Sequence, residues 1–481
     1  MSQIPYLLIL EWCVRLAVGL LIVLRRRAAT AALAWLVVVA FVPLFGAAAY
    51  FLVGENRLGR RRVKKYERII RDVRHAAQLE EDYRQIVQPQ ITDHLLPTAR
   101  LAEAVGAGAP LGGNGLMLLS RTDEAMADIV EQIDAAEHHC HLLFYIFQAD
   151  AVGQAVSEAL ARATRRGVAC RILADAVGSK PFLTDKLRAD MQRAGVRIVP
   201  VMPVNALRAA VARLDLRNHR KLAILDGRVA YTGSHNLSGP IYPRKEKYGA
   251  WVDASVRIRG PAVHALQEIF LRDWAFNCDE TIEDSEETLY PKYDRLTDGS
   301  SPVQVLPAGP DCDSAPLADV MLQAIRSARR RVVLTTPYFV PDETMITAIR
   351  SVALRGAEVV LVVPRHSDNI VAQAAGRSHY GYLLDVNVQI YEFTAGLLHA
   401  KTLTVDRELA IIGSANLDVR SFMLNFELAL LVYDTDFASH LHFLQQSYIN
   451  RSERLMLAAW QQRGAVRIVA DNIAKLATPL L

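Results

Sequence analysis

The chain has 481 residues, which is long enough for two or three domains. Its net charge of +4 is too small to mark a nucleic-acid-binding protein, and its five cysteines, with no CxxC pair among them, argue against a disulfide framework and for a reducing compartment. Hydrophobic residues make up 51% of the chain, and the excess is concentrated near the N-terminus. The composition therefore indicates a globular protein with an apolar N-terminal segment.

Two apolar segments open the chain. The second, residues 28–53, carries no charged residue and is long enough, at 1.5 Å per helical residue, to span a hydrocarbon core of ~30 Å. Pro43 is expected to kink this helix. The first, residues 5–24, is nearly as apolar, and its Glu11 and Arg15 would be i,i+4 neighbours that pair on one helix face. We predict a transmembrane helical hairpin that stays attached to the protein.

A basic run directly follows the second apolar segment. By the positive-inside rule it predicts that the large domain that follows is cytoplasmic, and the same side chains are suited to anionic lipid head groups. Three further arginines, residues 25–27, lie in the loop between the two segments. Either the first segment lies in the membrane interface or the stronger downstream run overrides the loop, and the sequence leaves both open. The basic run consists of Arg57, Arg60, Arg61, Arg62, Lys64, Lys65 and Arg68.

From about residue 111 the chain reads as two copies of one pattern. In the first copy a helical stretch, residues 123–136, precedes a strand-like run that ends in residues 141–150. A second helical stretch, residues 152–166, stops at Gly167 before the strand of residues 168–173. Glycines that end helices ahead of β-branched runs are typical of alternating helix and strand units.

The second copy repeats this order. A helical stretch, residues 318–328, precedes a strand-like run, residues 332–342, and the next helix stops at Gly356 before the strand of residues 358–363. The repeat predicts two α/β domains, each with a mixed sheet flanked by helices, joined by a linker near residues 279–301. The expected organisation is a transmembrane hairpin (1–54), a basic juxtamembrane segment and linker (55–110), a first domain (111–290) and a second domain (291–481).

Each copy contains the pattern HxKxxxxDxxxxxxGSxN without a gap. Alternate residues of a strand point to the same face, so the histidine and the lysine of each copy are expected to project together. The Gly-Ser-x-Asn segment would end the next strand and present a hydroxyl and an amide beside them. Lysine and asparagine suit the oxygens of a phosphodiester, and histidine suits covalent catalysis. The pattern consists of His219, Lys221, Asp226, Ser234 and Asn236 in the first copy, and of His399, Lys401, Asp406, Ser414 and Asn416 in the second.

Two carboxylates follow the motifs at equivalent places. Asp253 stands near the start of the strand after the first motif, and Glu427 near the start of the strand after the second. Catalytic histidines need a partner that fixes their tautomer. We therefore predict that Asp253 and Glu427 orient the histidines, the alternative being two solvated carboxylates at strand ends.

The doubled motif resembles the HKD signature of the phospholipase D superfamily, and the resemblance covers about residues 110–480. It implies a two-step transfer without metal or cofactor, in which one histidine forms a phosphohistidine and the other serves as acid and base. Superfamily usage favours His219 as the nucleophile and His399 as the acid/base, although nothing in the residues fixes that order. The resemblance gives Asp226 and Asp406 a place in the motif, where we expect them to brace turns.

Within that superfamily the sequence is similar to bacterial cardiolipin synthases of the phospholipase D type. The hairpin with its basic tail, residues 232–236, and residues 413–422 leading to Asn425 and Glu427 carry this similarity. It implies a multi-pass enzyme of the bacterial inner membrane that joins two phosphatidylglycerol molecules and releases glycerol. It implies no nucleic-acid partner and leaves the oligomeric state open. After Asn236 the first copy departs from the second, so contacts to the acceptor lipid are expected to differ between the halves.

Other interpretations remain in view. The motifs do not separate a transferase from a hydrolytic phospholipase D, since the choice depends on how well the site excludes water. A nuclease is disfavoured by the modest charge, and a binding module with a decayed site by two intact motifs. The cluster at residues 138–141 is not expected to bind a metal, because neighbouring strand residues point to opposite faces. The mildly amphipathic run of residues 465–481 is expected to pack on the domain rather than to touch the membrane.

Overall fold

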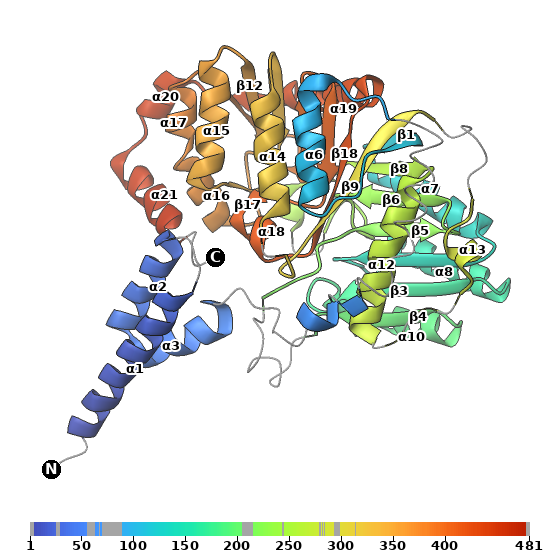
Figure 1. The fold of residues 1–481 in the computed structure, drawn as a ribbon, viewed down its shortest axis with the longest axis horizontal. Coiled ribbons are helices and arrows are strands. Elements are labelled where there is room, and N and C mark those ends of the chain that lie inside the picture. The colour runs from blue at the N-terminus through green and yellow to red at the C-terminus, as the bar shows by residue number, and fades with distance from the viewer. Residues whose placement is uncertain are drawn as a thin grey trace.

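A single mixed sheet runs through both copies of the repeat (Figure 1). Its strand order is β19-β13-β12-β10-β15-β16-β18-β9-β1-β8-β6-β5-β2-β3-β4. Apart from the edge strand β19, the order on one side of the β9–β1 pair mirrors the order on the other side. The computed structural model describes residues 4–25, 29–54, 63–66, 68–69, 89–203, 215–242, 245–278, 280, 282, 284–292, 299–312 and 314–477.

Apart from β19, which pairs antiparallel with β13 at the edge, the two halves contribute equivalent strands, parallel in the outer part of each half and antiparallel towards the centre. The first half supplies β1 (Leu111–Leu119), β2 (His139–Phe144), β3 (Ala169–Asp175), β4 (Arg197–Val201), β5 (Leu222–Leu225), β6 (Val229–Gly233) and β8 (Ser255–Arg259). The second half supplies β9 (Ser301–Ala308), β10 (Arg331–Thr335), β12 (Glu358–Pro364), β13 (Gln389–Phe393), β15 (Thr402–Val405), β16 (Leu409–Gly413), β18 (Glu427–Val432) and β19 (Ser452–Arg454). The α/β class and the repeated domains with a mixed sheet are therefore confirmed.

Helices cover both faces of the sheet. Along β5, Leu222 and Ile224 face a core that both halves share, whereas Ala223 and Leu225 face a core of the first half alone. The shared core lies under α12 (Ala262–Cys278) and α19 (Thr435–Ile449). On the other face the first half carries α7 (Thr122–Ala135), α8 (Ala151–Arg165), α9 (Lys180–Leu183) and α10 (Lys186–Arg193), and the second half carries α6 (Leu96–Ala104), α14 (Pro316–Ser327), α15 (Glu343–Leu354), α17 (Tyr380–Leu384) and α20 (Leu457–Gln461).

Equivalent helices of the two copies, α8 and α15, begin and end in the same way. The Asp150 carboxylate accepts a hydrogen bond from Gly153 N (3.0 Å) at the start of α8, and Asp342 accepts one from Met345 N (2.8 Å) at the start of α15. Just beyond these helices, Gly167 and Gly356 adopt φ values of 91° and 94°, which glycine reaches without a Cβ clash. The helices and strands expected around both glycines are confirmed within a few residues.

The N-terminal helices pack as a hairpin that extends away from the sheet (Figure 1). Helix α1 (Ile4–Leu24) contacts α2 (Ala29–Phe41), and Arg15 Nε donates to Ala40 O across them (3.0 Å). The expected pair of Glu11 and Arg15 forms, at 3.3 Å. Among the helices of the described residues, none combines the length and the apolar character needed to cross a membrane.

The second apolar segment is not the one kinked helix that the sequence predicts. Helix α2 ends at Phe41, and Val42 leaves the helical conformation with φ −133° and ψ 72° before α3 (Pro43–Ala49) begins. Proline lacks the N–H that would continue the hydrogen bonding of α2, so the chain restarts at Pro43 with the proline in the first turn of a new helix. A short π-helix, Tyr50–Gly54, follows. In the basic run, Arg57, Arg60, Arg61 and Arg62 lie outside the described residues, and Lys65 Nζ donates to Phe276 O (2.7 Å).

Parts of both expected linkers are packed against the domains. Helix α6 falls in the segment expected to be juxtamembrane, yet it lies on α14, and Gln304 Nε2 donates to Ala99 O of α6 (3.1 Å). Between the halves, the short helix α13 (Glu286–Leu289) forms, and Pro291 O lies 3.1 Å from His264 Nε2. The described parts of the two expected linkers therefore pack against the domains.

Candidate active site

The two motifs meet where the halves of the molecule join. His219 and Lys221 lie just before β5, and His399 and Lys401 lie just before β15, rather than within the strands as the sequence predicts. The backbone of each histidine is held by the opposite half: His219 N donates to Phe426 O (2.9 Å), and His399 N donates to Val252 O (2.8 Å). A two-stranded parallel pairing of β14 (Leu397–Leu398) with β7 (Trp251–Val252) supports the second of these contacts.

Each histidine is paired with the carboxylate of the other copy. His399 Nδ1 lies 2.6 Å from Asp253 Oδ1, and His219 Nδ1 lies 3.2 Å from Glu427 Oε1. Asn425 Nδ2 stands 3.1 Å from the same His219 Nδ1, so that two groups approach this atom. The predicted orienting role of Asp253 and Glu427 thus has the geometry it requires, with the partners exchanged between the halves.

Ionised carboxylates are favoured in these pairs. Burial raises the pKa of Asp253, but the charge of His399 and its hydrogen bond, together with the nearby cations, outweigh burial and hold that pKa below its ordinary value. In the same way burial raises the pKa of Glu427, and His219, Lys221 and Ser414 together lower it overall. Burial, then the charge of Lys401, lowers the pKa of His399 to about 4. A neutral His399 that donates from Nδ1 to Asp253 presents the lone pair of Nε2 to the site.

The two lysines are buried beside the histidines. Lys221 Nζ donates to His219 O (2.6 Å), and Lys401 Nζ donates to His399 O (2.5 Å). Burial lowers the pKa of Lys221 to about 8, while Glu427 and Asp253 oppose it. Burial also lowers the pKa of Lys401 to about 7, helped by the charge of Lys221. The two ammonium groups therefore act on each other within one site, and an anion between them would relieve their repulsion.

The serines of the motifs hold the carboxylates. Ser234 Oγ donates to Asp253 Oδ1 (2.6 Å), and Ser414 Oγ donates to Glu427 Oε2 (2.5 Å). Each hydroxyl also accepts a backbone N–H, from Ala254 and Leu428 respectively (both 3.0 Å). These bonds give the serines a positioning role, and the predicted contact of Ser234 and Ser414 with phosphate stays a prediction.

The two asparagines differ in their surroundings. Asn236 Oδ1 accepts from Ile146 N (3.2 Å), and Asn236 Nδ2 donates to Tyr242 Oη (3.0 Å). The side-chain oxygen of Asn416 is buried without a hydrogen-bond partner in the described part of the chain. The predicted phosphate-binding role therefore stays open for both, and the two halves differ at this position.

The aspartates of the motifs brace turns away from the reacting groups. Asp226 accepts backbone N–H groups at the start of β2, from residues 137–139, each at 2.8 Å. Asp406 does the same at the start of β10 with residues 329–331, at 2.7 to 2.8 Å. Both have positive φ, 52° and 54°, in the turns that join β5 to β6 and β15 to β16. This is the structural role expected for Asp226 and Asp406.

Aromatic residues that the sequence analysis did not single out flank both histidines. The ring of Tyr145 lies 4.1 Å from that of His219, and the ring of Trp251 lies 4.4 Å from that of His399, centroid to centroid. Lys245 Nζ stands 5.0 Å from the centre of the Trp251 ring and pairs with Asp368 of the other half (2.5 Å). The sequence offered a signal for both aromatic residues. Tyr145 directly follows β2, and Trp251 stands two residues before Asp253.

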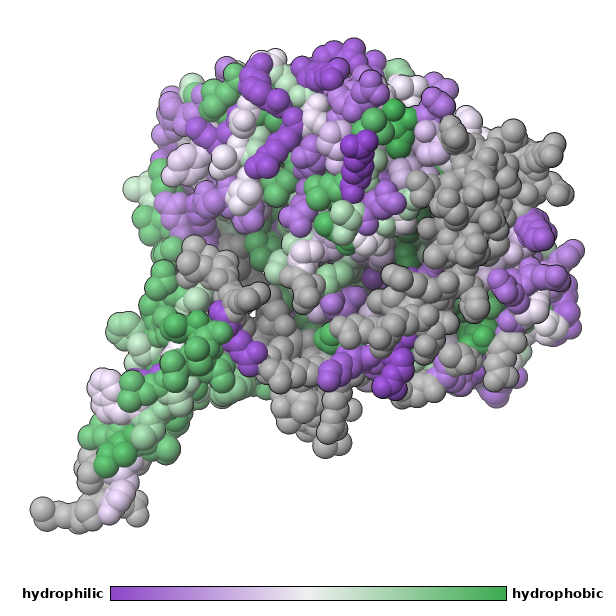
Figure 2. Space-filling model, in the orientation of Figure 1, coloured by the Kyte–Doolittle hydropathy of each residue, from purple (hydrophilic) through white to green (hydrophobic). Residues whose placement is uncertain are grey.

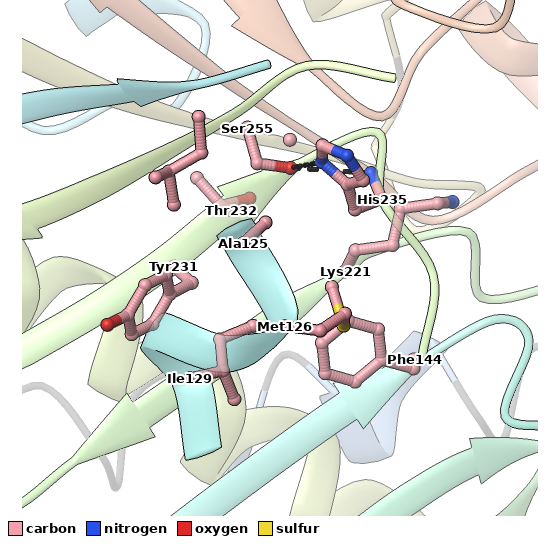
Figure 3. A pocket seen from close by; sticks show the side chains of 11 residues that line it. Ala125, Met126, Ile129, Phe144, Lys221, Tyr231, Thr232, His235 and Ser255 are labelled. Atoms are coloured by element: carbon pink, nitrogen blue, oxygen red, sulfur yellow. Dashed lines mark hydrogen bonds between the residues drawn. The ribbon is translucent and has the colours of Figure 1, made fainter. Parts of the chain in front are cut away.

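A small cavity lies behind the first motif (Figure 3). Lys221 and His235 line one end, and Met126, Ile129 and Phe144 line the apolar end. His235 Nδ1 is 2.9 Å from Ser255 Oγ, and its Nε2 has no hydrogen-bond partner among the described residues. A matching cavity behind the second motif has Ala415 in place of this histidine, so the halves also differ here.

A buried arginine inside the first motif was also missed. Arg220 Nη1 donates to both carboxylate oxygens of Asp273 on α12 (2.9 Å each), while its other nitrogens donate to Glu427 O (3.1 Å) and Ala308 O (3.2 Å). The second motif has Ala400 at this place. A charged residue within a buried strand-like run was the signal that sequence reasoning did not use.

Two histidines of the cluster at residues 138–141, His139 and His141, take part in packing, whereas His138 is exposed. His139 and His141 stack at 4.3 Å, and His141 stacks on Phe270 at 4.4 Å. Burial lowers the pKa of His139 to about 4. In the described part of the chain no group of three or more His, Cys, Asp or Glu side chains is placed to hold a metal ion.

Two half-sites, each with a histidine, a lysine and a crossed carboxylate on a doubled α/β scaffold, define a phosphodiester-processing enzyme of the HKD class. Residues 129–274 and 321–446 match the family described as "Cardiolipin synthase, PLD-like domain", and residues 16–55 match "Phospholipase_D-nuclease N-terminal". The chain is 35% identical to cardiolipin synthase A from Serratia proteamaculans (strain 568) over 477 residues, which cover 98% of this chain and 97% of that protein. It is also 35% identical to cardiolipin synthase A from Erwinia tasmaniensis over 476 residues, with the same coverage.

Among solved structures, phosphatidylserine synthase from Haemophilus influenzae Rd KW20 shares the fold. The TM-score is 0.59 at 16% identity, over 80% of this chain and 100% of that chain. The chain belongs to the cardiolipin synthase family of the phospholipase D superfamily. The enzymes of the cardiolipin synthase family are phosphatidyltransferases.

Proposed function

We propose that the protein is a cardiolipin synthase that transfers a phosphatidyl group from one phosphatidylglycerol to another and releases glycerol. The near full-length similarity to two enzymes named cardiolipin synthase A supports the reaction. The observation that carries it is the crossed arrangement, in which each histidine is paired with the carboxylate of the other copy and a buried lysine lies beside each histidine.

In the first step Nε2 of His219 attacks the phosphorus of the donor lipid. The new N–P bond replaces the bond from phosphorus to the glycerol oxygen, and the departing alkoxide takes a proton from His399. The lysines neutralise the two non-bridging oxygens as charge builds on them. Because the phosphate is anionic, it favours the protonated form of His399 that this step needs. The roles of His219 and His399 in this order are part of the proposal.

In the second step the glycerol head group of another phosphatidylglycerol replaces the lost glycerol. Nε2 of His399 removes the proton of its primary hydroxyl, the oxygen attacks phosphorus, and the N–P bond to His219 breaks. Cardiolipin forms, and both imidazoles return to their starting state. Asp253 and Glu427 hold the Nδ1 atoms in place throughout, and the two steps as proposed use no metal or cofactor.

The N-terminal hairpin would place this site at the bacterial inner membrane, as a multi-pass segment with the catalytic body on the cytoplasmic side. The apolar residues exposed on α1 to α3 and the match of residues 16–55 support this placement. Lys64 and Arg68, with the preceding arginines, would contact anionic lipids, whereas Lys65 is held by Phe276 of the body. No nucleic-acid partner is proposed, and the oligomeric state is left open.

The test is a product assay on the purified full-length protein without added metal or nucleotide. Phosphatidylglycerol vesicles are the substrate, and mass spectrometry identifies the lipid products. We expect cardiolipin and free glycerol, with a loss of at least about a thousand-fold in His219→Ala and in His399→Ala. Tyr382→Phe, on the surface of α17 away from the site, is the control that should retain full activity.

The other outcomes separate the alternatives. Phosphatidic acid alone would identify a hydrolytic phospholipase D, because water would then resolve the phosphohistidine. No product from any phospholipid would refute a lipid-processing function, and cleavage of a single-stranded oligonucleotide under the same conditions would point to a membrane-tethered nuclease.

A further inference from the structure

The last helix, α21 (Ala465–Ala477), is attached to the body by one side only. Its Asp471 is buried and pairs with Arg463 (2.8 Å) and with Arg377 of α16 (3.7 Å). Ala474 packs against the small apolar cluster of α16 (Ile370–Arg377), and Lys475 pairs with Glu343 (2.9 Å). These contacts fix the rotation of α21 about its own axis.

The opposite side of α21 presents an apolar stripe to the outside. Val466, Val469, Ile473 and Leu476 are 85%, 55%, 62% and 74% exposed. Their spacing of three, four and three residues places them on one face of the helix. The expected packing of the C-terminal run is therefore realised on one side only, and the larger side chains point away from the protein. A contiguous exposed apolar stripe of this kind marks an interaction surface.

The surroundings of the stripe match a lipid surface. In the view of Figure 1 one end of α21 is drawn close to the end of the N-terminal hairpin, and in Figure 2 hydrophobic colouring extends from the hairpin onto this flank of the molecule. The hairpin exposes large apolar side chains of its own, with Phe41 82% and Phe45 73% exposed. Asp471 is the only acidic residue of α21 and is buried, whereas Arg467 is exposed. An apolar face with basic but no acidic exposed residues suits an anionic bilayer.

We propose that α21 is a second membrane contact, which lies in the interface of an anionic bilayer beside the N-terminal hairpin. This proposal rests on the membrane placement given under the proposed function. The hairpin tethers the molecule, so the effective concentration of lipid at α21 is high and a stripe of four side chains is sufficient. Two contacts at different points fix the tilt of the catalytic body over the membrane, which one tether cannot do.

Site-specific labelling tests this in the full-length protein. The accessible cysteines Cys13, Cys278 and Cys312 are replaced by serine, and a single cysteine carrying an environment-sensitive fluorophore is introduced at Ile473, at its neighbour Asn472, or at Phe45. The protein is reconstituted in vesicles of phosphatidylethanolamine and phosphatidylglycerol, with or without brominated acyl chains. Asn472 is exposed but lies about 100° around the helix from Ile473, so it is the matched control.

We expect bromine to quench the labels at positions 45 and 473 strongly and the label at 472 much less. Quenching at 45 but not at 473 would overturn the role of α21 and leave the hairpin in the membrane. Quenching at neither position would overturn both. A label at 473 that is shielded in detergent and indifferent to bromine would overturn the proposal in favour of a second copy of the chain as the occupant.

A pair of neighbouring substitutions that each introduce one negative charge gives a functional readout. Ile473→Asp places a charge in the stripe, and Asn472→Asp places the same charge on its flank. We expect Ile473→Asp to reduce turnover of phosphatidylglycerol in vesicles several-fold while turnover of a short-chain, monomeric phosphatidylglycerol stays unchanged, and Asn472→Asp to alter neither. Equal rates for both variants on vesicles would contradict the proposal. If the wild-type protein makes no cardiolipin, the labelling result still decides the role of α21.

Discussion

At the scale of single residues, the site is defined by the exchange of partners between the two copies. Asp253 serves His399 and Glu427 serves His219, so neither half holds a complete histidine–carboxylate pair from its own sequence. The two pairs are also unequal. His399 Nδ1 has one close carboxylate at 2.6 Å, whereas His219 Nδ1 has Glu427 at 3.2 Å and Asn425 at 3.1 Å. This inequality is a physical basis for two histidines with different roles in the proposed reaction.

The buried lysines predict the pH dependence of activity. Burial lowers the pKa of Lys401 to about 7 and that of Lys221 to about 8, from 10.5. The ammonium groups that we propose bind phosphate are therefore lost as pH rises through 7 to 8, and we expect kcat/KM, which reports the free enzyme, to fall over that range. Lys401→Arg keeps its charge at these pH values and should move the fall to higher pH.

The stability of the fold is expected to rise with pH over the range in which activity falls. Between pH 7 and 10.5 the unfolded chain binds more protons at these lysines than the folded protein, so the free energy of unfolding should rise with pH. A pH series of kcat/KM beside a pH series of chemical unfolding checks both. A parallel decline of activity and stability would mean that unfolding, and not lysine titration, limits the enzyme.

At the scale of elements, the turns after the motifs depend on one aspartate each. Asp406 joins the β15–β16 turn to the start of β10 through three backbone N–H groups, and its φ of 54° is one that only a few residue types adopt readily. Asp226 repeats this arrangement at β2. The aspartate of the motif thus sets the register between a hairpin and the neighbouring strand, and so the position of the histidine that precedes the hairpin.

Removing the Asp406 carboxylate should therefore weaken folding more than chemistry. Glycine tolerates the positive φ, so Asp406→Gly removes the hydrogen bonds without new strain, and we expect a loss of roughly 2–4 kcal/mol in the free energy of unfolding. Asp406→Asn keeps one acceptor oxygen and should lose less. Urea unfolding measures the loss, and activity is compared per folded molecule. An inactive variant of unchanged stability would instead place Asp406 in the reaction.

At the scale of the whole molecule, one sheet and one shared core make the halves a single unit. Strands β1 and β9 pair antiparallel, and the core under α12 and α19 contains residues of both halves. Arg220 adds a buried polar link between the halves. It lies within the first motif, pairs with Asp273 of α12, and donates to the backbone oxygen of Glu427 in β18. The positions of the two motif histidines relative to each other are thus fixed by contacts between the two halves.

Breaking this link should be costly. Arg220→Met leaves the Asp273 carboxylate buried without its cation, and we expect the free energy of unfolding to fall by about 3–5 kcal/mol. In the wild-type protein Asn218 donates to Asp273 (3.0 Å). Combining Arg220→Met with Asp273→Asn removes the uncompensated charge and leaves Asn218 an amide oxygen as its acceptor. The double variant should recover most of the loss in a double-mutant cycle. A double variant as unstable as the single one would show that packing of the Arg220 side chain, not its charge, is what matters.

The sequence by itself determined the residues of the two motifs, the internal repeat and the α/β fold class. The doubled motif, the helix-ending glycines and the apolar strands are local features, and local periodicity and spacing are sufficient to predict the α/β repeat and its histidines. The break before Pro43 was predictable only as a kink, because a proline can bend a helix or end it according to its surroundings.

Only the tertiary structure decided which residues meet. The crossing of Asp253 and Glu427 to opposite histidines, the partners of Arg220 and the outward face of α21 all depend on contacts between segments far apart in the chain. A strand pattern states which face a side chain occupies but not what stands opposite it. That information arises only when the two halves close into one sheet and bury the motifs between them.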